Sequence, residues 1–183
     1  MKLIYLTIVL FFVSCDPDKL GKKEFITWCN SNLTETKEFN QLKIDARILP
    51  EEYFVASDNR ERNTGLTQNI YASVKFYQKD GEESLFGKYN SKEFQDRLNY
   101  FVENAKKDFQ LVSNQDTFSP QLYHFERYYN IANFSIVNLV FEVPRKNYYQ
   151  SNSLVYNDQI FNIGKIAFSF DHFNSEIPQL IEN

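Results

Sequence analysis

Two residues of the kinds used in acid–base catalysis, His124 and Glu126, lie two positions apart in a segment with the pattern of a β-strand. Side chains at this spacing in a strand point to the same face, so the imidazole and the carboxylate could form an acid–base pair. A surface-facing pair beside Tyr128 explains the same spacing without catalysis. We therefore assign no catalytic residue from the sequence.

The same segment carries aromatic residues around one arginine. Tyr123, Phe125, Arg127 and Tyr129 alternate along it, which predicts that they share one face of the strand, and Tyr128 lies beside them. Tyrosine and arginine are enriched at recognition surfaces, including protein interfaces and platforms on which sugars stack. A half-buried sheet would use the same residues, because tyrosine has a high β-propensity. We take these five residues as the candidate binding surface.

Residues suited to a metal or a cofactor are scarce. The chain has five glycines, two histidines that are far apart, and two cysteines, with no glycine-rich phosphate-binding motif and no Cys-x-x-Cys motif. We therefore expect no metal site and no cofactor. The net charge of −4 lacks the basic footprint of a nucleic-acid-binding protein, so no nucleic-acid partner is expected.

The first fifteen residues have the pattern of a secretory signal peptide. Lys2 precedes an apolar run over residues 3–13 that only Thr7 interrupts. A run of about eleven residues is too short to span a bilayer as a helix but matches the apolar region of a signal peptide. The four residues that end the segment, Phe12-Val13-Ser14-Cys15, resemble the lipobox of bacterial lipoprotein precursors, with Phe12 where leucine is usual. The resemblance implies cleavage before Cys15 and lipid attachment to Cys15.

A second interpretation is an ordinary secreted protein with cleavage nearby. Cys15 would then pair with Cys29, and Asn32 and Asn133 would be glycosylation acceptors if the source were eukaryotic. In the lipoprotein interpretation, Cys29 is the only free thiol, and we expect it to be a small buried apolar residue.

The remaining length suits one domain. We expect a signal peptide at 1–14, the lipidated cysteine and a tether at 15–23, and a single domain at 24–183.

Alternation of apolar and polar residues is the main structural signal within this domain. It predicts strands at 42–48, 70–77, 121–129, 134–143 and 165–171. Asp80-Gly81 predicts a hairpin turn into a further strand at 84–89.

Two segments instead have helical spacing. Residues 91–109 carry an apolar stripe and begin with a capping pair, Asn90 and Glu93, and a shorter helix is expected at 23–31. The predicted fold class is therefore α+β: an antiparallel sheet of about five or six strands packed against one main helix at about 91–109.

Three functions are compatible with these features. The first is a lipid-anchored protein of the bacterial cell envelope, facing the periplasm or the cell exterior, that acts in binding or assembly and is not an enzyme. Its partners would be the membrane, through the lipid on Cys15, and an envelope protein. The second is a protective lipoprotein that binds a toxin or an inhibitor. The third is a hydrolase whose site has no recognised motif.

Overall fold

The computed structural model describes residues 19–61, 64–79, 85–127, 134–148, 150–171, 173 and 177–181. Cys15 and the segment before it therefore lie outside the described residues.

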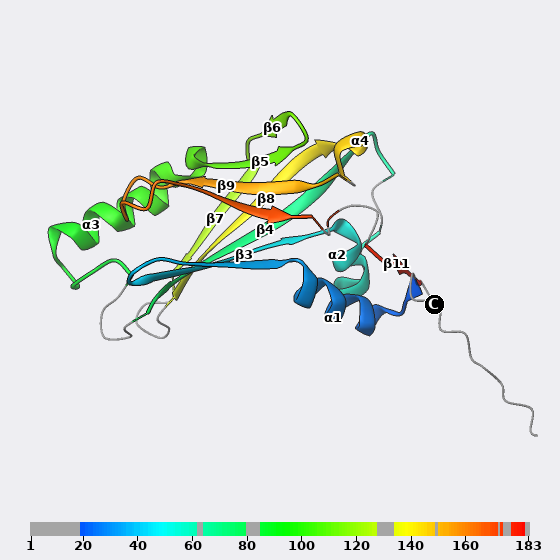
Figure 1. Cartoon of the computed structure of the whole chain (residues 1–183), viewed down its shortest axis with the longest axis horizontal. Coiled ribbons are helices and arrows are strands. Elements are labelled where there is room, and N and C mark those ends of the chain that lie inside the picture. The colour runs from blue at the N-terminus through cyan, green and yellow to red at the C-terminus, as the bar shows by residue number, and fades with distance from the viewer. Residues whose placement is uncertain are drawn as a thin grey trace, which may run out of the picture.

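A five-stranded antiparallel sheet forms one layer of the molecule (Figure 1). Its strands, in spatial order, are β2 (Thr34–Glu38), β3 (Leu42–Leu49), β4 (Thr67–Gln78), β8 (Phe134–Pro144) and β7 (Leu122–Arg127). β3, β4 and β8 follow the predicted alternation: the mainly apolar side chains of one face are buried, and the more polar side chains of the other face are half-exposed.

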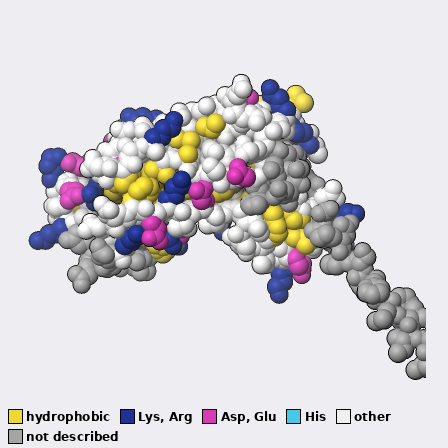
Figure 2. Space-filling model, in the orientation of Figure 1, with side chains coloured by type: hydrophobic (Ala, Val, Ile, Leu, Met, Phe, Trp, Pro, Cys, Tyr) yellow, Lys and Arg dark blue, Asp and Glu magenta, His cyan; other side chains and the backbone are white. Residues whose placement is uncertain are grey.

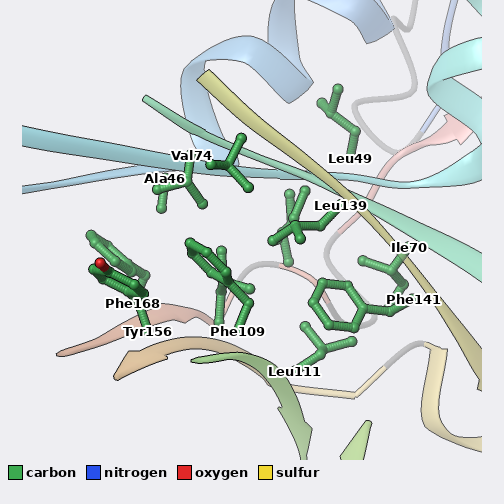
Figure 3. Packing of buried hydrophobic residues seen from close by; sticks show 14 of the residues in the cluster. Ala46, Leu49, Ile70, Val74, Phe109, Leu111, Leu139, Phe141, Tyr156 and Phe168 are labelled. Carbon is green, nitrogen blue, oxygen red and sulfur yellow. The ribbon is translucent and has the colours of Figure 1, made fainter. Parts of the chain in front are cut away.

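A second antiparallel sheet of four strands faces the first. Its strands, in spatial order, are β10 (Lys165–Phe170), β9 (Asn152–Asn157), β5 (Phe109–Ser113) and β6 (Asp116–Phe118). The main core lies between the two sheets. In Figure 3, Val74 and Leu139 of the first sheet point toward Phe109 and Tyr156 of the second. The α+β class with an antiparallel sheet of five strands is thus confirmed, and the second sheet is an addition that the sequence did not predict.

The predicted main helix begins within one residue of the expected position, but the predicted capping pair of Asn90 and Glu93 is wrong and the end of the helix differs. Helix α3 (Lys92–Asn99) is capped by Ser91, whose hydroxyl accepts a hydrogen bond from the Phe94 amide, while Asn90 has a positive φ of 63°. The helix continues through a π-helical turn, Tyr100–Asn104, and a 3₁₀ turn, Ala105–Asp108. Phe109, which was predicted as the last residue of the helix, instead begins β5. Its fully buried side chain packs between the two sheets, with its ring 4.7 Å from that of Tyr156.

Two other predicted boundaries also change. Residues 85–90 form turns, so the strand predicted at 84–89 is wrong over this part, and Asp80 and Gly81 lie outside the described residues. The tether predicted at 15–23 overlaps a strand, because Lys19–Leu20 forms β1, which pairs in parallel with β11 (Gln179–Leu180).

Helices gather at the end of the molecule where β1 and β11 lie. They are α1 (Lys22–Asn32), α2 (Glu51–Asp58) and, beyond them, α4 (Arg145–Tyr148). Cys29 in α1 is fully buried, as predicted, and burial raises the pKa of its thiol to about 12. No helix in the described ranges combines the length and apolar character needed to cross a membrane.

Candidate ligand-binding groove

The aromatic face predicted as a binding surface points into the molecule. Phe125 stacks on Phe101, with ring centroids 5.1 Å apart, and meets Phe86 at 5.9 Å. The Tyr123 hydroxyl donates a hydrogen bond to the Phe101 carbonyl, and burial raises the pKa of this hydroxyl above its ordinary value. Both side chains are half-buried, because this face of β7 packs against the π-helical turn that follows α3, so it is not the open surface that the sequence predicted.

The other predicted residues of this segment do not form a site either. Arg127 is half-buried, and Tyr128 and Tyr129 lie outside the described residues. On the opposite face of β7, His124 is exposed, while Glu126 accepts a hydrogen bond from Asn138 on β8 at 2.6 Å. This contact ties Glu126 to the neighbouring strand, so the proposed acid–base pair with His124 gains no support.

A groove of about 810 Å³ lies instead at the end of the molecule that α3 covers. Its walls come from the β2–β3 hairpin, the end of β4, α3 with the turn before it, and the loop between β9 and β10. The lining residues are Glu38, Phe39, Asn40, Gln41, Leu42, Gln78, Gly87, Glu93, Arg97, Phe161, Asn162 and Ile163. Figure 2 shows hydrophobic side chains ringed by charges of both signs between α3 and this hairpin.

Arg97 is the central cation of the α3 wall. Its guanidinium forms an ion pair with Glu93 one helical turn earlier, donates a hydrogen bond to the Leu85 carbonyl at 3.1 Å, and lies 5.3 Å from the centre of the Phe161 ring. Only 23% of this side chain is exposed. Arg97 therefore joins the helix wall to the loop wall.

Gly87 allows this arrangement. Its φ is +86°, and a Cβ at this position would lie 3.3 Å from a carboxylate oxygen of Glu93. Any other residue would strain the backbone and crowd the ion pair that positions Arg97.

The β2–β3 hairpin forms the opposite wall and carries a second ion pair. Glu38 and Lys79 are 2.7 Å apart, and this hydrogen bond is the main reason that the pKa of Glu38 lies below its ordinary value. The backbone of the turn is also paired, since Phe39 and Leu42 exchange hydrogen bonds and the Gln41 carbonyl accepts from the Lys79 amide.

The third wall, the loop from Asp158 to Gly164, is organised by one carboxylate. Asp158 is 9% exposed and accepts hydrogen bonds from the amides of Ile160, Phe161 and Ile163 at 2.9–3.1 Å. The loop closes where the Asp158 amide donates to the Gly164 carbonyl. A single buried acceptor thus holds Phe161 and Ile163 in the groove.

A buried polar network lies behind this loop. The Tyr156 hydroxyl donates to Asp158 at 3.1 Å, and the Tyr100 hydroxyl donates to Asp108 at 2.9 Å. The two hydroxyl groups also interact with each other, and burial is the main cause that raises the pKa of both. The network connects the loop wall to the helix, so two walls of the groove share one internal support.

The side chains that line the groove suit hydrogen bonding and apolar contact with a ligand. Among the described residues, its lining contains no Ser, Thr, Cys, His, Lys or Tyr side chain that could act as a nucleophile. Its two carboxylates are ion-paired, and a depressed pKa makes Glu38 a poor proton donor. The part of the chain that the structure describes contains no group of three or more His, Cys, Asp or Glu side chains arranged to hold a metal.

None of the residues that line the groove was predicted as part of a binding site, because they come from four separate segments of the chain. A local signal did exist at the third wall, where Asp158 is followed by Asn162 and Gly164, two residues that tolerate the positive φ values they adopt here, 58° and 71°. The i,i+4 spacing of Glu93 and Arg97 was a second signal.

Comparisons with known proteins do not assign a family. No family model and no curated protein matches the chain. One solved structure, a protein of unknown function from Burkholderia pseudomallei, is similar with a TM-score of 0.37 and 8% identity, over 85% of each chain. Similarity of this degree carries no argument about function.

Proposed function

We propose that this protein is a lipid-anchored cell-envelope protein of the binding type, which presents the groove to a ligand away from the membrane. The observation that carries the proposal is the placement of the groove at the opposite end of the molecule from β1 (Figure 1). The chain leads from β1 directly toward Cys15, the residue that resembles a lipidation site.

Cys15 lies only four residues before β1 in the sequence, so a lipid on Cys15 would fix which end of the domain is near the membrane. Four peptide units separate Cys15 from Lys19, which limits their separation to about 14 Å when fully extended. A lipid on Cys15 would therefore hold the β1 end close to the bilayer. Pairing of β1 with β11, together with the hydrogen bond from the Ile181 amide to the Leu20 carbonyl at 2.8 Å, ties this end to the domain.

The groove supports binding because it is already formed and held by buried contacts. Preformed sites lose less conformational entropy when they bind. Its volume is within the range of about 300–1,000 Å³ that is usual for small-ligand sites. Its described lining mixes apolar and hydrogen-bonding side chains, as such sites do, and its two carboxylates, Glu38 and Glu93, are held in ion pairs.

Lipid attachment is tested by labelling the full-length chain with an alkyne analogue of palmitate during expression in bacteria. We expect Cys15→Ser to abolish both the label and cleavage of the signal peptide. Cys29→Ala is the matched control, since it removes the other cysteine and should leave both intact. Normal labelling or normal cleavage of the Cys15→Ser protein would contradict the anchor.

Use of the groove is tested separately with a photo-crosslinking amino acid at Gln41, which is an exposed residue of the lining. The control position is Gln115, which is exposed in the turn between β5 and β6. We expect an adduct in cells from position 41 and none from position 115. Equal labelling at both positions, or none at position 41, would show that the groove is not the binding site.

A further inference from the structure

The charges of the groove are neutralised by residues of the protein itself. Glu38 is paired with Lys79 at 2.7 Å, and Glu93 is paired with Arg97, which also stacks near Phe161. Because each carboxylate of the lining already has a cationic partner, the groove presents no excess of one charge that would attract a polyanion or a polycation. The groove therefore matches a ligand without net charge.

Four amide side chains in the lining remain available to such a ligand. They are Asn40, Gln41, Gln78 and Asn162. Within the described part of the chain, none of these amides forms a hydrogen bond through its side chain. Each amide offers both a carbonyl acceptor and two N–H donors. A ligand that carries several neighbouring hydroxyl groups, each able to donate and to accept a hydrogen bond, would complement these four amides.

Apolar side chains lie between these amides. Phe39, Leu42, Phe161 and Ile163 line the same groove, and the loop that Asp158 organises holds the last two. A pyranose ring has C–H faces that pack on apolar and aromatic side chains and an edge of hydroxyl groups that bond to amides. The groove offers both kinds of contact.

The structure is less suited to an extended peptide. Peptides that bind to a sheet commonly add a strand by pairing with free backbone groups at its edge. The hairpin turn that lines the groove has already paired those groups, through Phe39, Leu42 and the bond between the Gln41 carbonyl and the Lys79 amide.

We infer that the groove binds an uncharged saccharide chain through these four amides and the apolar side chains between them. The inference rests on the proposed function, because it names the ligand class of the same groove.

The test is calorimetric titration of the full-length protein, in detergent, with three neutral hexasaccharides: cellohexaose, maltohexaose and hexa-N-acetylchitohexaose. Heparin and pentalysine serve as charged comparators. We expect at least one hexasaccharide to bind with a Kd of about 1 mM or tighter, and neither charged probe to compete with it.

Two variants locate the binding in the groove. Asn162→Gly keeps the positive φ of this position while it removes the amide, and Gln41→Ala removes a second amide. Each should weaken saccharide binding about fivefold, the usual effect of one lost hydrogen bond, whereas Gln115→Ala should leave it unchanged.

Failure of all three hexasaccharides to bind, or unchanged affinity in both groove variants, would overturn the inference. This failure is distinguishable from failure of the proposed function. A saccharide-negative protein that is still acylated at Cys15 and still gives an adduct from position 41 would retain its anchor and its binding site, with a ligand of another class.

Discussion

The two ends of the molecule are each organised by one buried polar side chain, and the two side chains differ in charge. At the groove end, Asp158 accepts hydrogen bonds from three backbone amides and from the Tyr156 hydroxyl. At the β1 end, the fully buried Tyr148 hydroxyl accepts from the Glu51 amide at 2.6 Å and donates to Glu52 at 2.8 Å.

The surroundings of these two residues also differ. Tyr148 joins the start of α2 to a region where α1 and α2 pack through buried apolar residues such as Phe25 and Val55. Asp158 holds a loop in which Ile160, Phe161 and Ile163 are only partly buried. The β1 end is therefore stabilised mainly by buried apolar packing, whereas the groove loop combines the hydrogen bonds of Asp158 with the looser packing of Phe161 against Phe76 and Phe101.

The largest expected effect concerns the tight packing of the β1 end. Because burial raises the pKa of Cys29 from 9.0 to about 12, the thiolate population near pH 8 falls by about a thousandfold. We expect Cys29 to react with a thiol reagent at least this much more slowly in the native protein than in denaturant. Rapid native-state labelling, at the rate of a Glu61→Cys control on the exposed surface, would show that α1 opens readily.

The next effect concerns the carboxylate of the groove wall. Asp158→Ala should destabilise the protein by about 3 kcal/mol, because it leaves several buried donors without an acceptor. Amide exchange of Phe161 and Ile163 should accelerate more than that of the central strands. Denaturant unfolding and hydrogen exchange measure both effects. Asp96→Ala, on the exposed face of α3, is the control, and an equal loss of stability in that variant would refute the special role of Asp158.

A smaller effect is expected from the corresponding change at the other end. Tyr148→Phe removes one hydroxyl and leaves the Glu51 amide and Glu52 without this partner, at a cost of about 1–2 kcal/mol. Tyr53→Phe, in the half-buried ring cluster with Phe54, should change stability little. If Tyr148→Phe cost more than Asp158→Ala, our ranking of the two ends would have to be reversed.

The smallest effect is electrostatic and lies at the rim of the groove. Lys79→Gln should raise the pKa of Glu38 toward its ordinary value, since the bond to Lys79 is the main cause that lowers it. A lowered pKa in the folded state means that the stabilisation is present above the ordinary pKa of the carboxyl and disappears as the pH falls through its folded value. An NMR titration of the Glu38 carboxyl measures the change. Lys88→Gln, at an exposed position, should leave the titration where it is.

The sequence allowed about half of the sheet structure to be predicted. β3, β4, β8 and β10 bury apolar residues on one face only, so their alternation is visible in the chain. β2 has no apolar residue: Glu35 and Lys37 face inward at the sheet edge and contact β10, with Glu35 accepting a bond from the Ser169 amide and Lys37 lying 5.8 Å from the Phe168 ring. A strand of this kind leaves no periodic signal.

The candidate site could not be predicted in this way. Tyr123 and Phe125 have the residue types of a recognition surface, but only the packing of β7 against Phe101 decides that they face inward. The groove, in turn, consists of turn and loop residues that the periodic pattern does not address.

The α+β class, the central antiparallel strands and the burial of Cys29 could be predicted from the chain alone, because each depends on local composition or on the period of apolar residues. The resemblance of the leader to a lipoprotein signal is likewise a local pattern. The buried face of β7, the second sheet that closes the core and the position of the groove become visible only in the folded chain. Those features depend on contacts between segments far apart in the chain, such as that of Arg97 with Phe161, and no local pattern encodes them.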